Sequence, residues 1–452
     1  MSASITDSLS THLEQVADMV ADYFEYDDSL ASQLKPSKTV QATRYLYRVP
    51  YKRSSGGYMK KVSMDRGALG SGTGPVFSHF TAGFINTVCN FEVTQEQMDL
   101  SGDGAARVDV LNDILENAMR VASRHDNIHL FNDGTGKLTS ASNSISGTTI
   151  LVFDAATDTL GVNQLFVGMG VDVWDSTGAT KRAGGPFTIT NIDAASKTVT
   201  LSSAVTSLTA GDLLAVPDAD AYGPSTLTSF SSTWPGGALT TAAGLTGDSF
   251  RHGLRYVNDS TSSNYYLGRL KSAYTDLMAN RVNAEGANIT FSHGELAKNR
   301  LLTSSRGGPK SLSGLRAVMH VGQAHALKDA GMAITRDIAQ VGGQSFKDLM
   351  PTGEYGDVFS FAGVPAFASK IQDFKRVDYF NPSTWGRVEA HPTQFYKNPG
   401  NGSYIWPVLG SGGSAGQYLA AFEMRVKQCG DWVCEDPGAA VYIDNLAKPS
   451  GY

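Results

Sequence analysis

Two stretches of the chain repeat apolar residues at the spacing of an amphipathic helix. In residues 6–24 one face is apolar and consists of Leu9, Leu13, Val16, Val20 and Tyr23. Residues 104–129 carry a longer apolar stripe, made of Val108, Leu111, Leu115, Ala118 and Ala122 and widened by Val110, Ile114 and Val121. Ser101 or Asp103 can cap this second helix, and the glycine-rich run LFNDGTG at 130–136 predicts its end.

A long basic hairpin that begins with a strand-like run is predicted for residues 44–77. RYLYRVPY leads into SSGG, YMKKVSM follows, and GALGSGTG closes the segment. Few of these side chains could form a core, so the hairpin would be a liability on a monomer but makes sense laid over a neighbouring copy. Residues 79–100 then contain the strand-like run HFTAGFINTVCNFEVT.

Residues 142–218 differ in composition from the rest of the chain. They are rich in Thr, Val, Ser, Gly and Asp, and their only bases are Lys181, Arg182 and Lys197. Five short runs recur between turn signals: TTILVF, VDVWD, FTIT, KTVTLS and DLLAV. Five strands at this spacing predict a small β-barrel or sandwich, inserted into a region that is otherwise mixed α and β.

The pattern between about 223 and 394 alternates between helix and strand. YLGRLKSAYTDLMANRV at 266–282 is predicted as a helix from its period, LRAVMH as a strand, and GQAHALKDAGM as a helix that ends at Gly331. FAGVPAFASK is predicted as a strand interrupted by Pro365. Residues 395–417 have loop composition, and LAAFEMRVKQ and AAVYI are predicted as closing strands.

Length and composition place the chain among multidomain globular proteins. Its 452 residues fit two or three domains, and 41% hydrophobic residues are enough for a sizeable core. The chain contains no run of eighteen apolar residues, so no membrane helix is predicted. The stretch MSASITDSLS lacks the features of a secretory signal. Three cysteines, Cys89, Cys429 and Cys434, are too few for a disulfide framework, which indicates a reducing compartment.

Charge is distributed unevenly along the chain. The net charge of −6 argues against a protein whose main task is gripping DNA phosphates. Residues 1–30 hold seven acids and no Lys or Arg, whereas residues 31–66 hold nine bases and one acid. Such adjacent blocks suggest contacts between copies of the chain, and the alternative is two solvated faces that never meet. The contact candidates are the hairpin bases and the acids of the long helix: Arg44, Arg48, Lys52, Arg53, Lys60, Lys61, Arg66, Asp109, Asp113 and Glu116.

Three spots imitate active or metal sites. His125 and His129 have the i, i+4 spacing of two metal ligands, but Asp126 stands where a zincin carries Glu, and no third ligand follows at a known spacing. A phosphate loop around Gly136 fails because Phe131 and Leu138 occupy positions that need Gly and Ser or Thr. Cys429 and Cys434 have no second cysteine pair, so structural cysteines are the better interpretation.

The order of these elements resembles the Hong Kong 97-type capsid fold of tailed-phage major capsid proteins. ILENAMRVASRHDNIHLFNDGTGK at 114–137 is similar to the family's spine helix running into a glycine turn. FAGVPAFASKIQDFKRVDYFNPSTWG at 361–386 is similar to a Gly-x-Pro strand followed by a strand that feeds an axial loop, and EDPGAAVYI at 435–443 to the closing peripheral strand. Each motif alone is weakly specific, and their order over nearly the whole chain outside 142–218 carries the resemblance.

The resemblance implies an α+β fold with five parts. These are an N-terminal arm at 1–43, an extended loop at 44–77, a peripheral domain at 78–141 and 395–452 with its spine helix at 104–129, an inserted β-domain at 142–218, and an axial domain at 219–394. It implies a structural protein with no cofactor and no enzymatic activity, found in the virion and assembled in the host cytoplasm. Some family members crosslink a loop lysine, and Lys52, Lys60 or Lys61 could serve, but no motif fixes a partner.

The partners implied by the resemblance are other copies of the chain in hexamers and pentamers. They also include a portal, a separate scaffolding protein or none, a decoration protein, and packaged double-stranded DNA held by weak non-specific contact, with no membrane. Three rival functions stay open. They are an encapsulin-like bacterial shell protein, a metal-dependent hydrolase using His125 and His129, and a phage tail or adhesion protein whose residues 142–218 bind sugar.

Overall fold

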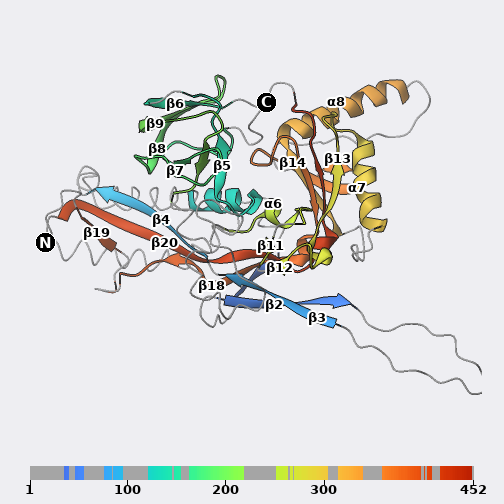
Figure 1. Cartoon of the computed structure of the whole chain (residues 1–452), viewed down its shortest axis with the longest axis horizontal. Helices are drawn as coiled ribbons and strands as arrows, with labels where there is room; N and C mark the ends of the chain where they lie inside the picture. The colour runs from blue at the N-terminus through green and yellow to red at the C-terminus, as the bar shows by residue number, and fades with distance from the viewer. Residues whose placement is uncertain are drawn as a thin grey trace, which may run out of the picture. The chain divides into compact units, whose positions relative to one another are not determined.

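The chain folds into two units whose segments alternate along the sequence. The computed structural model describes residues 35–39, 46–54, 76–83, 85–94, 121–144, 147–153, 162–217, 251–262, 265–267, 269–303, 314–338, 359–398, 402, 405–409 and 418–449. Unit 1 comprises 1–42, 84–130 and 386–432, and unit 2 comprises 43–83, 131–385 and 433–452. Figure 1 labels the elements of both units.

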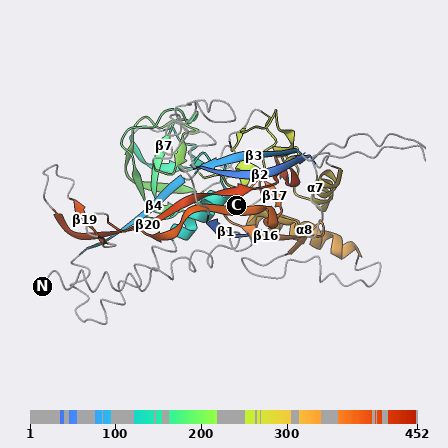
Figure 2. The ribbon, with the colours of Figure 1, turned by 90° about the horizontal axis from the view of Figure 1, so that it is seen from below.

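Unit 1 is built on one five-stranded sheet. Its strands are β1 (Lys35–Thr39), β4 (Ile85–Thr94), β18 (Trp385–Phe395), β19 (Ile405–Leu409) and β20 (Tyr418–Cys434). The long strand β20 is central, because β18, β19 and β4 all pair with it. β4 and β20 run side by side over ten paired residues, as Figure 2 also shows. β1 is parallel to the start of β18.

The long helix predicted for residues 104–129 is described only from residue 121 onward. Residues 121–131 are helical, so the helix ends two residues later than predicted. The turn that follows uses Gly134 and Gly136, whose φ angles of 80° and 76° suit glycine, as the run LFNDGTG predicts. The amphipathic stretch 6–24 lies outside the described residues.

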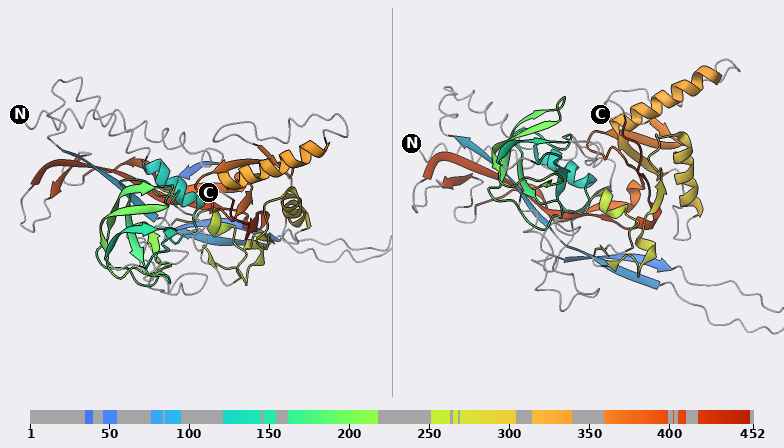
Figure 3. Two further views of the ribbon diagram at one scale, coloured as in Figure 1. Left: turned by 90° about the horizontal axis from the view of Figure 1, so that it is seen from above. Right: turned by 45° about the horizontal axis from the view of Figure 1, so that its top comes forward.

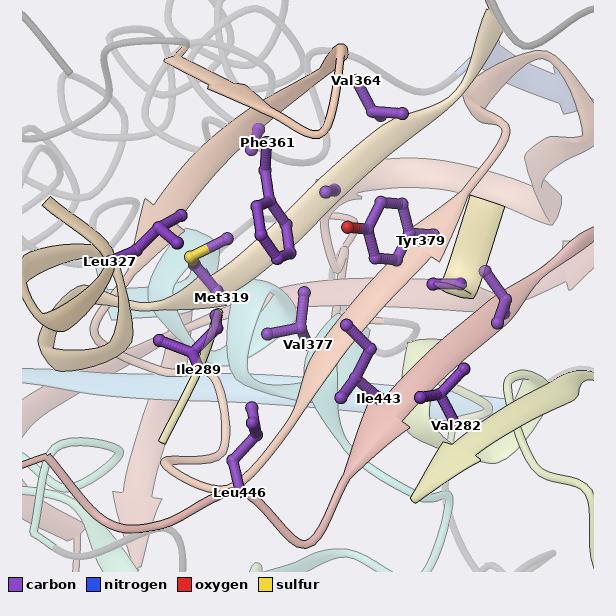
Figure 4. Packing of buried hydrophobic residues seen from close by; sticks show 14 of the residues in the cluster. Val282, Ile289, Met319, Leu327, Phe361, Val364, Val377, Tyr379, Ile443 and Leu446 are labelled. Carbon is purple, nitrogen blue, oxygen red and sulfur yellow. The ribbon is translucent and has the colours of Figure 1, made fainter. Parts of the chain in front are cut away.

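The main sheet of unit 2 has six strands in the order β13-β21-β17-β14-β16-β15. They are β13 (Asn280–Asn283), β14 (Arg316–His320), β15 (Phe359–Phe361), β16 (Val364–Ser369), β17 (Val377–Phe380) and β21 (Val441–Asp444). The helices α7 (Phe291–Thr303) and α8 (Val321–Ile338) accompany it. Ten residues labelled in Figure 4 belong to the apolar core of this sheet, among them Met319, Phe361 and Tyr379.

A second six-stranded sheet of unit 2 occupies the region predicted as a β-barrel or sandwich. Its strands are β5 (Lys137–Ser140), β6 (Thr148–Val152), β7 (Gly170–Trp174), β8 (Phe187–Asp193), β9 (Thr198–Val205) and β10 (Leu213–Ala215), in the order β5-β10-β7-β8-β9-β6. The five predicted strands are confirmed as β6 to β10, and β5 is an addition. Figure 3 shows these strands in green from two directions.

Hydrogen bonds connect the segment just after β5 with β6, so the two ends of this strand order approach each other, as expected of a small barrel. The Ser142 N–H, just after β5, donates to the Val152 carbonyl of β6 at 2.8 Å. The Asn143 side chain donates to the Ile150 carbonyl at 2.9 Å and accepts from the Val152 N–H at 3.0 Å. Along β8, buried Phe187 and Ile189 alternate with exposed Thr188. The approach of the two ends shields part of the outer strand edges, and the apolar side chains fill the inside.

A two-stranded ribbon, β2 (Leu46–Ser54) with β3 (Val76–Gly83), makes up a separate antiparallel sheet of unit 2. The strand-like start of the hairpin predicted for 44–77 is confirmed as β2, and its partner β3 begins only at Val76 and continues beyond the predicted hairpin. The loop residues 55–75 lie outside the described residues. The remaining short elements are α6 (Leu254–Val257), β11 (Tyr265–Tyr266), β12 (Arg269–Leu270), η4 (Thr275–Leu277), η7 (Pro382–Thr384) and η8 (Pro437–Ala439).

Three predictions in the region 223–394 are wrong in detail. The helix predicted for 266–282 is instead β11, β12, η4 and β13, because a turn with a positive φ at Leu267 breaks the chain and β13 gains hydrogen bonds by pairing with β21. α8 continues through Gly331 to Ile338, since one interior glycine costs only about 1 kcal/mol. FAGVPAFASK is not one strand, because a tight turn at Ala362 and Gly363 separates β15 from β16, and Pro365 lies inside β16.

The strand predicted at 315–320 is confirmed as β14, and the strand-like run 79–94 as β3 and β4. The two predicted closing strands are confirmed as β20 and β21. The two units divide the chain at 385/386 and again at 432/433, and the predicted domain boundary at 394/395 stays a prediction. β21 pairs with β13 and β17 of unit 2. The assignment of the parts to arm, loop, peripheral and axial domains stays a prediction.

Candidate functional site

The ribbon of β2 and β3 holds the described part of the predicted contact residues. Arg48, Lys52 and Arg53 lie on β2, where Arg48 is opposite Thr81 and Lys52 is opposite Phe77 of β3. The other predicted contact residues lie outside the described residues: Arg44, Lys60, Lys61, Arg66, Asp109, Asp113 and Glu116. Whether these residues meet acids of another copy stays a prediction.

The ribbon has two unpaired edges among the strands that the structure describes. β2 and β3 pair with each other from Leu46–Gly83 to Ser54–Val76, and neither pairs with another described strand. A two-stranded sheet is marginally stable by itself in water, and its outer N–H and C=O groups invite pairing or packing with other protein. The ribbon is thus suited to a contact with a second surface.

The two histidines of the metal hypothesis lie on one helix in unit 1. The rings of His125 and His129 are stacked with their centroids 6.2 Å apart. Burial, with a smaller contribution from the charge of Arg124, lowers the pKa of His125 to about 4, so its ring is neutral at pH 7. Among the residues with described positions, no group of three His, Cys, Asp or Glu side chains could hold a metal ion.

A buried ion cluster in unit 1 connects that helix to the sheet. The Arg387 guanidinium of β18 lies 3.5 Å from the Asp126 carboxylate and 2.5 Å from the Glu389 carboxylate. It also lies 5.6 Å from the ring centre of Trp432 on β20. Because one cation contacts acids from a helix and a strand, the cluster fixes the helix end against β18 and β20. Asp126, the residue that departs from the zincin pattern, thus has a structural partner.

The cysteines lie in or beside the closing strand β20. All three are free thiols, and Cys429 and Cys434 are buried. Burial raises the pKa of Cys434 to about 12, so this thiol is protonated and unreactive at neutral pH. In unit 2 the Tyr266 hydroxyl donates to the Cys434 carbonyl at 2.8 Å and accepts from the Cys434 N–H at 3.0 Å. These contacts favour the structural interpretation of the cysteines.

A polar network inside the main sheet of unit 2 was missed by the sequence patterns. Arg376 forms a two-pronged ion pair with Asp378 of β17, with distances of 2.8 to 3.0 Å. Gln372 donates to the same carboxylate at 2.6 Å, and the Arg376 guanidinium lies 4.1 Å from the ring centre of Tyr442. Gln372, Arg376 and Asp378 are close in sequence, but Tyr442 comes from β21, and no spacing rule connects it with the other three. The network is closed and buried, as a structural core element is.

A cationic and aromatic surface on the unit 1 sheet was also missed. It contains Arg425 and Lys427 of β20 together with Tyr396 and Trp406. The alternation of apolar and charged residues in FEMRVK at 422–427 could have indicated it, because every second residue of a strand faces the same side.

The described helices include none that is long and apolar enough to cross a membrane.

Comparison with known proteins gives similarity at the level of structure only. No family model matches the chain, and no curated protein matches it. The chain is similar to a protein of the cyanophage A-1(L) capsid asymmetric unit, with 11% identity, a TM-score of 0.46 and 93% of each chain covered. It is similar to the capsid of the empty GTA particle, with 10% identity, a TM-score of 0.41 and 93% of this chain and 90% of that chain covered. The holo-SrpI encapsulin complex from Synechococcus elongatus matches with 10% identity, a TM-score of 0.36 and 94% of this chain and 88% of that chain covered.

Proposed function

We propose that the chain is the major capsid subunit of a tailed bacteriophage. Many copies assemble into a closed icosahedral shell around double-stranded DNA, and the subunit is a structural protein without enzymatic activity. The sequence supports this proposal through the order of its elements, from an acidic amphipathic segment and a basic hairpin to the spine-like helix and the closing strands. The observation that carries the proposal is the ribbon of β2 and β3.

The ribbon is difficult to explain on a solitary subunit. It extends over nine residues of β2 and eight of β3 and pairs with no other described strand. The segment 31–66, which contains β2, has nine bases and one acid. A ribbon with free edges and high positive charge is stable and soluble when a complementary surface covers it. In a lattice of identical subunits a neighbour supplies that surface at every position, so a weak contact is multiplied.

The roles of the separate parts of the chain follow from the resemblance and belong to the proposal. Residues 1–43 act as an arm and 44–77 as an extended loop, and both reach neighbouring copies. Residues 78–141 and 395–452, with the spine helix at 104–129, form the peripheral part, and 219–394 form the axial part. The region 142–218 is an inserted β-domain, an assignment supported by its own apolar interior and by the hydrogen bonds that connect the segment after β5 with β6.

The proposed partners are other copies of the chain in hexamers and pentamers, a portal and packaged DNA. A separate scaffolding protein and a decoration protein are further candidates. The contact with DNA is weak and non-specific, because a net charge of −6 gives little overall attraction to phosphate. The subunit is assembled in the host cytoplasm and belongs to the virion.

Negative-stain electron microscopy of the purified protein tests the proposal. We expect closed shells, or hexameric and pentameric capsomers, at concentrations where an ordinary globular protein stays monomeric. A monodisperse monomer at high concentration would contradict it. Extraction of the shell contents then separates a phage capsid, which encloses DNA, from an encapsulin-like shell, which encloses protein cargo.

A further inference from the structure

Three neighbouring strands of the second six-stranded sheet of unit 2 have one buried and one open side. β6, β9 and β8 pair in this order and lie next to one another in Figure 1. The register places Ile150 of β6 opposite Thr200 of β9, and Thr200 opposite Asn191 of β8. Ile150 is 47% exposed and Asn191 is exposed, whereas the adjacent residues Leu151 and Val199 are buried. Alternate side chains therefore form a solvent-exposed row across the three strands.

The open side of these strands is almost free of charge. The three strands contain one charged residue, Asp193, which is the last residue of β8. On a typical soluble surface about 25–35% of the residues are charged, so an exposed sheet side without charges in its middle is unusual. Charged residues are depleted in the same way at the centre of a protein contact. We define the β6–β9–β8 face by six exposed or half-buried residues: Ile150, Val152, Thr190, Asn191, Thr198 and Thr200.

Several polar groups of the β6–β9–β8 face already have partners within the sheet. The Thr190 hydroxyl donates to the Thr200 carbonyl at 3.1 Å. Beside β6, the Asn143 side chain donates to the Ile150 carbonyl at 2.9 Å and accepts from the Val152 N–H at 3.0 Å. These groups keep their hydrogen bonds when water is excluded, so a flat protein surface can cover the face at a small desolvation cost.

The turn between β8 and β9 adds one acid and one base at the rim of this face. Asp193 accepts hydrogen bonds from the Ala195 and Ser196 N–H groups of its own turn, at 2.9 and 3.2 Å. Lys197 directly precedes β9. Among the residues that the structure describes, neither side chain forms an ion pair. Both charges are therefore available to a partner that carries the opposite charges.

An uncharged centre with one acid and one base at the rim is complementary to itself. We propose that the β6–β9–β8 face packs against the same face of a second copy about a two-fold axis, an inference that rests on the proposed shell function. In a two-fold contact the same surface serves both partners, so Asp193 of each copy can face Lys197 of the other. The centre contributes no repulsion between identical surfaces. Two such sheets can stack at about 10 Å, the usual spacing of packed sheets.

A second copy fits this face better than a nucleic acid or a partner of one charge sign does. Nucleic acid needs several cations for its phosphates, but β6, β8 and β9 contain no Lys or Arg, and Lys197 shares its turn with Asp193. A strongly acidic or strongly basic partner would be repelled by one of the two rim charges. A surface that carries both signs at the same spacing satisfies both charges, and every further copy of the chain has that surface.

Photo-crosslinking tests the proposal with the assembled full-length protein. Ile150 is replaced with benzoylphenylalanine, and Leu296 on α7, which is 44% exposed, is replaced in a control protein. Unlabelled and ¹⁵N-labelled copies are assembled together and crosslinked, and the joined peptides are identified by mass spectrometry. We expect position 150 to join β6, β8 or β9 of a copy with the other label, and position 296 not to do so. Crosslinks from position 150 only within one copy, only to other segments, only to nucleic acid, or none at all would overturn the proposal.

A charge swap adds a second readout. Lys197→Glu should lower the yield of this crosslink by about tenfold, because both contacts between Asp193 and position 197 become repulsive. Asp193→Lys should lower it similarly, and a mixture of the two variants should restore most of the yield, because unlike copies then carry opposite charges at both contacts. Lys328→Glu on α8, an exposed position, should leave it unchanged. An unaltered yield in Lys197→Glu, or a mixture no better than the single variants, contradicts the proposal. Electron microscopy of the same samples separates the two levels: shells without the crosslink refute only this contact, whereas the absence of any assembly refutes the shell function itself.

Discussion

At the scale of single residues, the Arg376–Asp378 pair shows what a buried charge in this protein depends on. Asp378 is almost fully buried and accepts hydrogen bonds from Arg376, Gln372 and Asn258. The Arg376 guanidinium also donates to the Asn258 carbonyl and lies over the Tyr442 ring. Desolvation of two charges is offset here by a complete set of partners. Removing one partner therefore lowers the free energy of unfolding by much more than the intact pair contributes to it.

Asp378→Ala should destabilise the subunit by about 3–5 kcal/mol, because it leaves the Arg376 charge buried without a counterion. Glu295→Ala removes the acid of an exposed pair with Lys298, in which the Glu295 side chain is 51% exposed, and should cost about 0–1 kcal/mol. Urea titration of unassembled subunits measures both free energies of unfolding. Equal losses in the two variants would show that the buried network has no special weight.

His320 is a second residue with a large predicted effect on stability. It is buried at the end of β14, where its Nδ1 accepts the Gly322 N–H at 2.9 Å and its ring packs against Phe374 at 4.2 Å between centroids. Burial, with a smaller contribution from the charge of Lys448, lowers the pKa of His320 to about 4 from the ordinary 6.5. The side-chain amide of Asn163, which belongs to the segment before β7, lies 3.3 Å from the His320 Nε2. A charged ring would disturb this contact between the barrel segment and the main sheet.

The contribution of His320 to the stability of unit 2 should be lost as the pH falls from 6.5 to 4, whereas the partly buried Asp436, whose pKa is raised to about 6, contributes with the opposite sign in the same range. In this window the unfolded chain binds a proton at His320 that the folded chain does not, so acid favours unfolding, by on the order of 3 kcal/mol once the pH is below 4. Above 6.5 this contribution to stability is fully present. His320→Asn keeps an acceptor near Gly322 and removes the titration of His320, so in urea titrations the variant should lose less stability than the wild type between pH 6.5 and 4. His125, whose pKa is also about 4, remains in the variant and retains part of the slope. An unchanged slope would exclude His320 as a source.

At the scale of elements, the alternation of apolar and polar residues predicted strands well where alternate side chains of a strand are buried. The runs of the barrel became β6 to β10, because alternate side chains such as Phe187 and Ile189 enter its interior. The same reasoning failed for 266–282, because the buried Tyr266 lies on β11 and the buried Leu277 in η4, and their spacing only imitates a helical period. Helix α7 was not predicted at all. Its apolar stripe is thin, with Ala297 and Leu301 buried beside Gly294.

Parts of the site could not be read from sequence because they depend on register. The cationic and aromatic surface of unit 1 depends on the register that places Arg425 and Lys427 opposite Asn90 and Val88, and pairing between strands more than 300 positions apart leaves no local signal. The charge blocks of the arm and loop, by contrast, are visible in the sequence itself. Gly430 is a further case, since its role becomes visible only from its neighbour on β18.

Gly430→Ala should destabilise unit 1, because a Cβ at this position would lie 2.7 Å from the Val388 carbonyl oxygen, a backbone atom that can move only with its strand. We expect a loss of about 1–3 kcal/mol, as for other overpacked sites. Gly386→Ala on β18 is the matched control: its Cβ would meet nothing within 4 Å, and it should be neutral or slightly stabilising. Thermal unfolding followed by circular dichroism compares the two. If Gly386→Ala is the more harmful change, the close approach of β18 and β20 is not what requires a glycine at 430.

At the scale of the whole molecule, the separation of acids and bases along the chain is the feature that assembly would use. Seven acids in 1–30 and nine bases in 31–66 belong to the same subunit, so identical copies can present one block to the other. Exposed ion pairs contribute only about 0–1 kcal/mol each. A closed lattice repeats every contact, so the sum can decide between free subunits and shells.

Lys60→Glu with Lys61→Glu should spare the fold and cripple assembly, because these loop lysines are predicted to face acids on an adjacent copy. The defect should be more severe at low salt, where repulsion between like charges is least screened. Circular dichroism reports the fold, and light scattering over a salt series reports assembly. Normal assembly at low salt would mean that the charge blocks are solvated surface and that cohesion comes from apolar residues such as Tyr45, Tyr47, Tyr51 and Tyr58. Unfolding of the variant would place the loop in its own subunit's core.

The central claim is that the ribbon of β2 and β3 is covered by a neighbouring copy. Cryo-electron microscopy of the purified wild-type protein at a resolution that traces strands tests this most directly. The shell account predicts closed particles with icosahedral symmetry, in which residues 46–54 and 76–83 lie against another subunit. A monomeric or small oligomeric particle in which both strands pack on their own chain would contradict it.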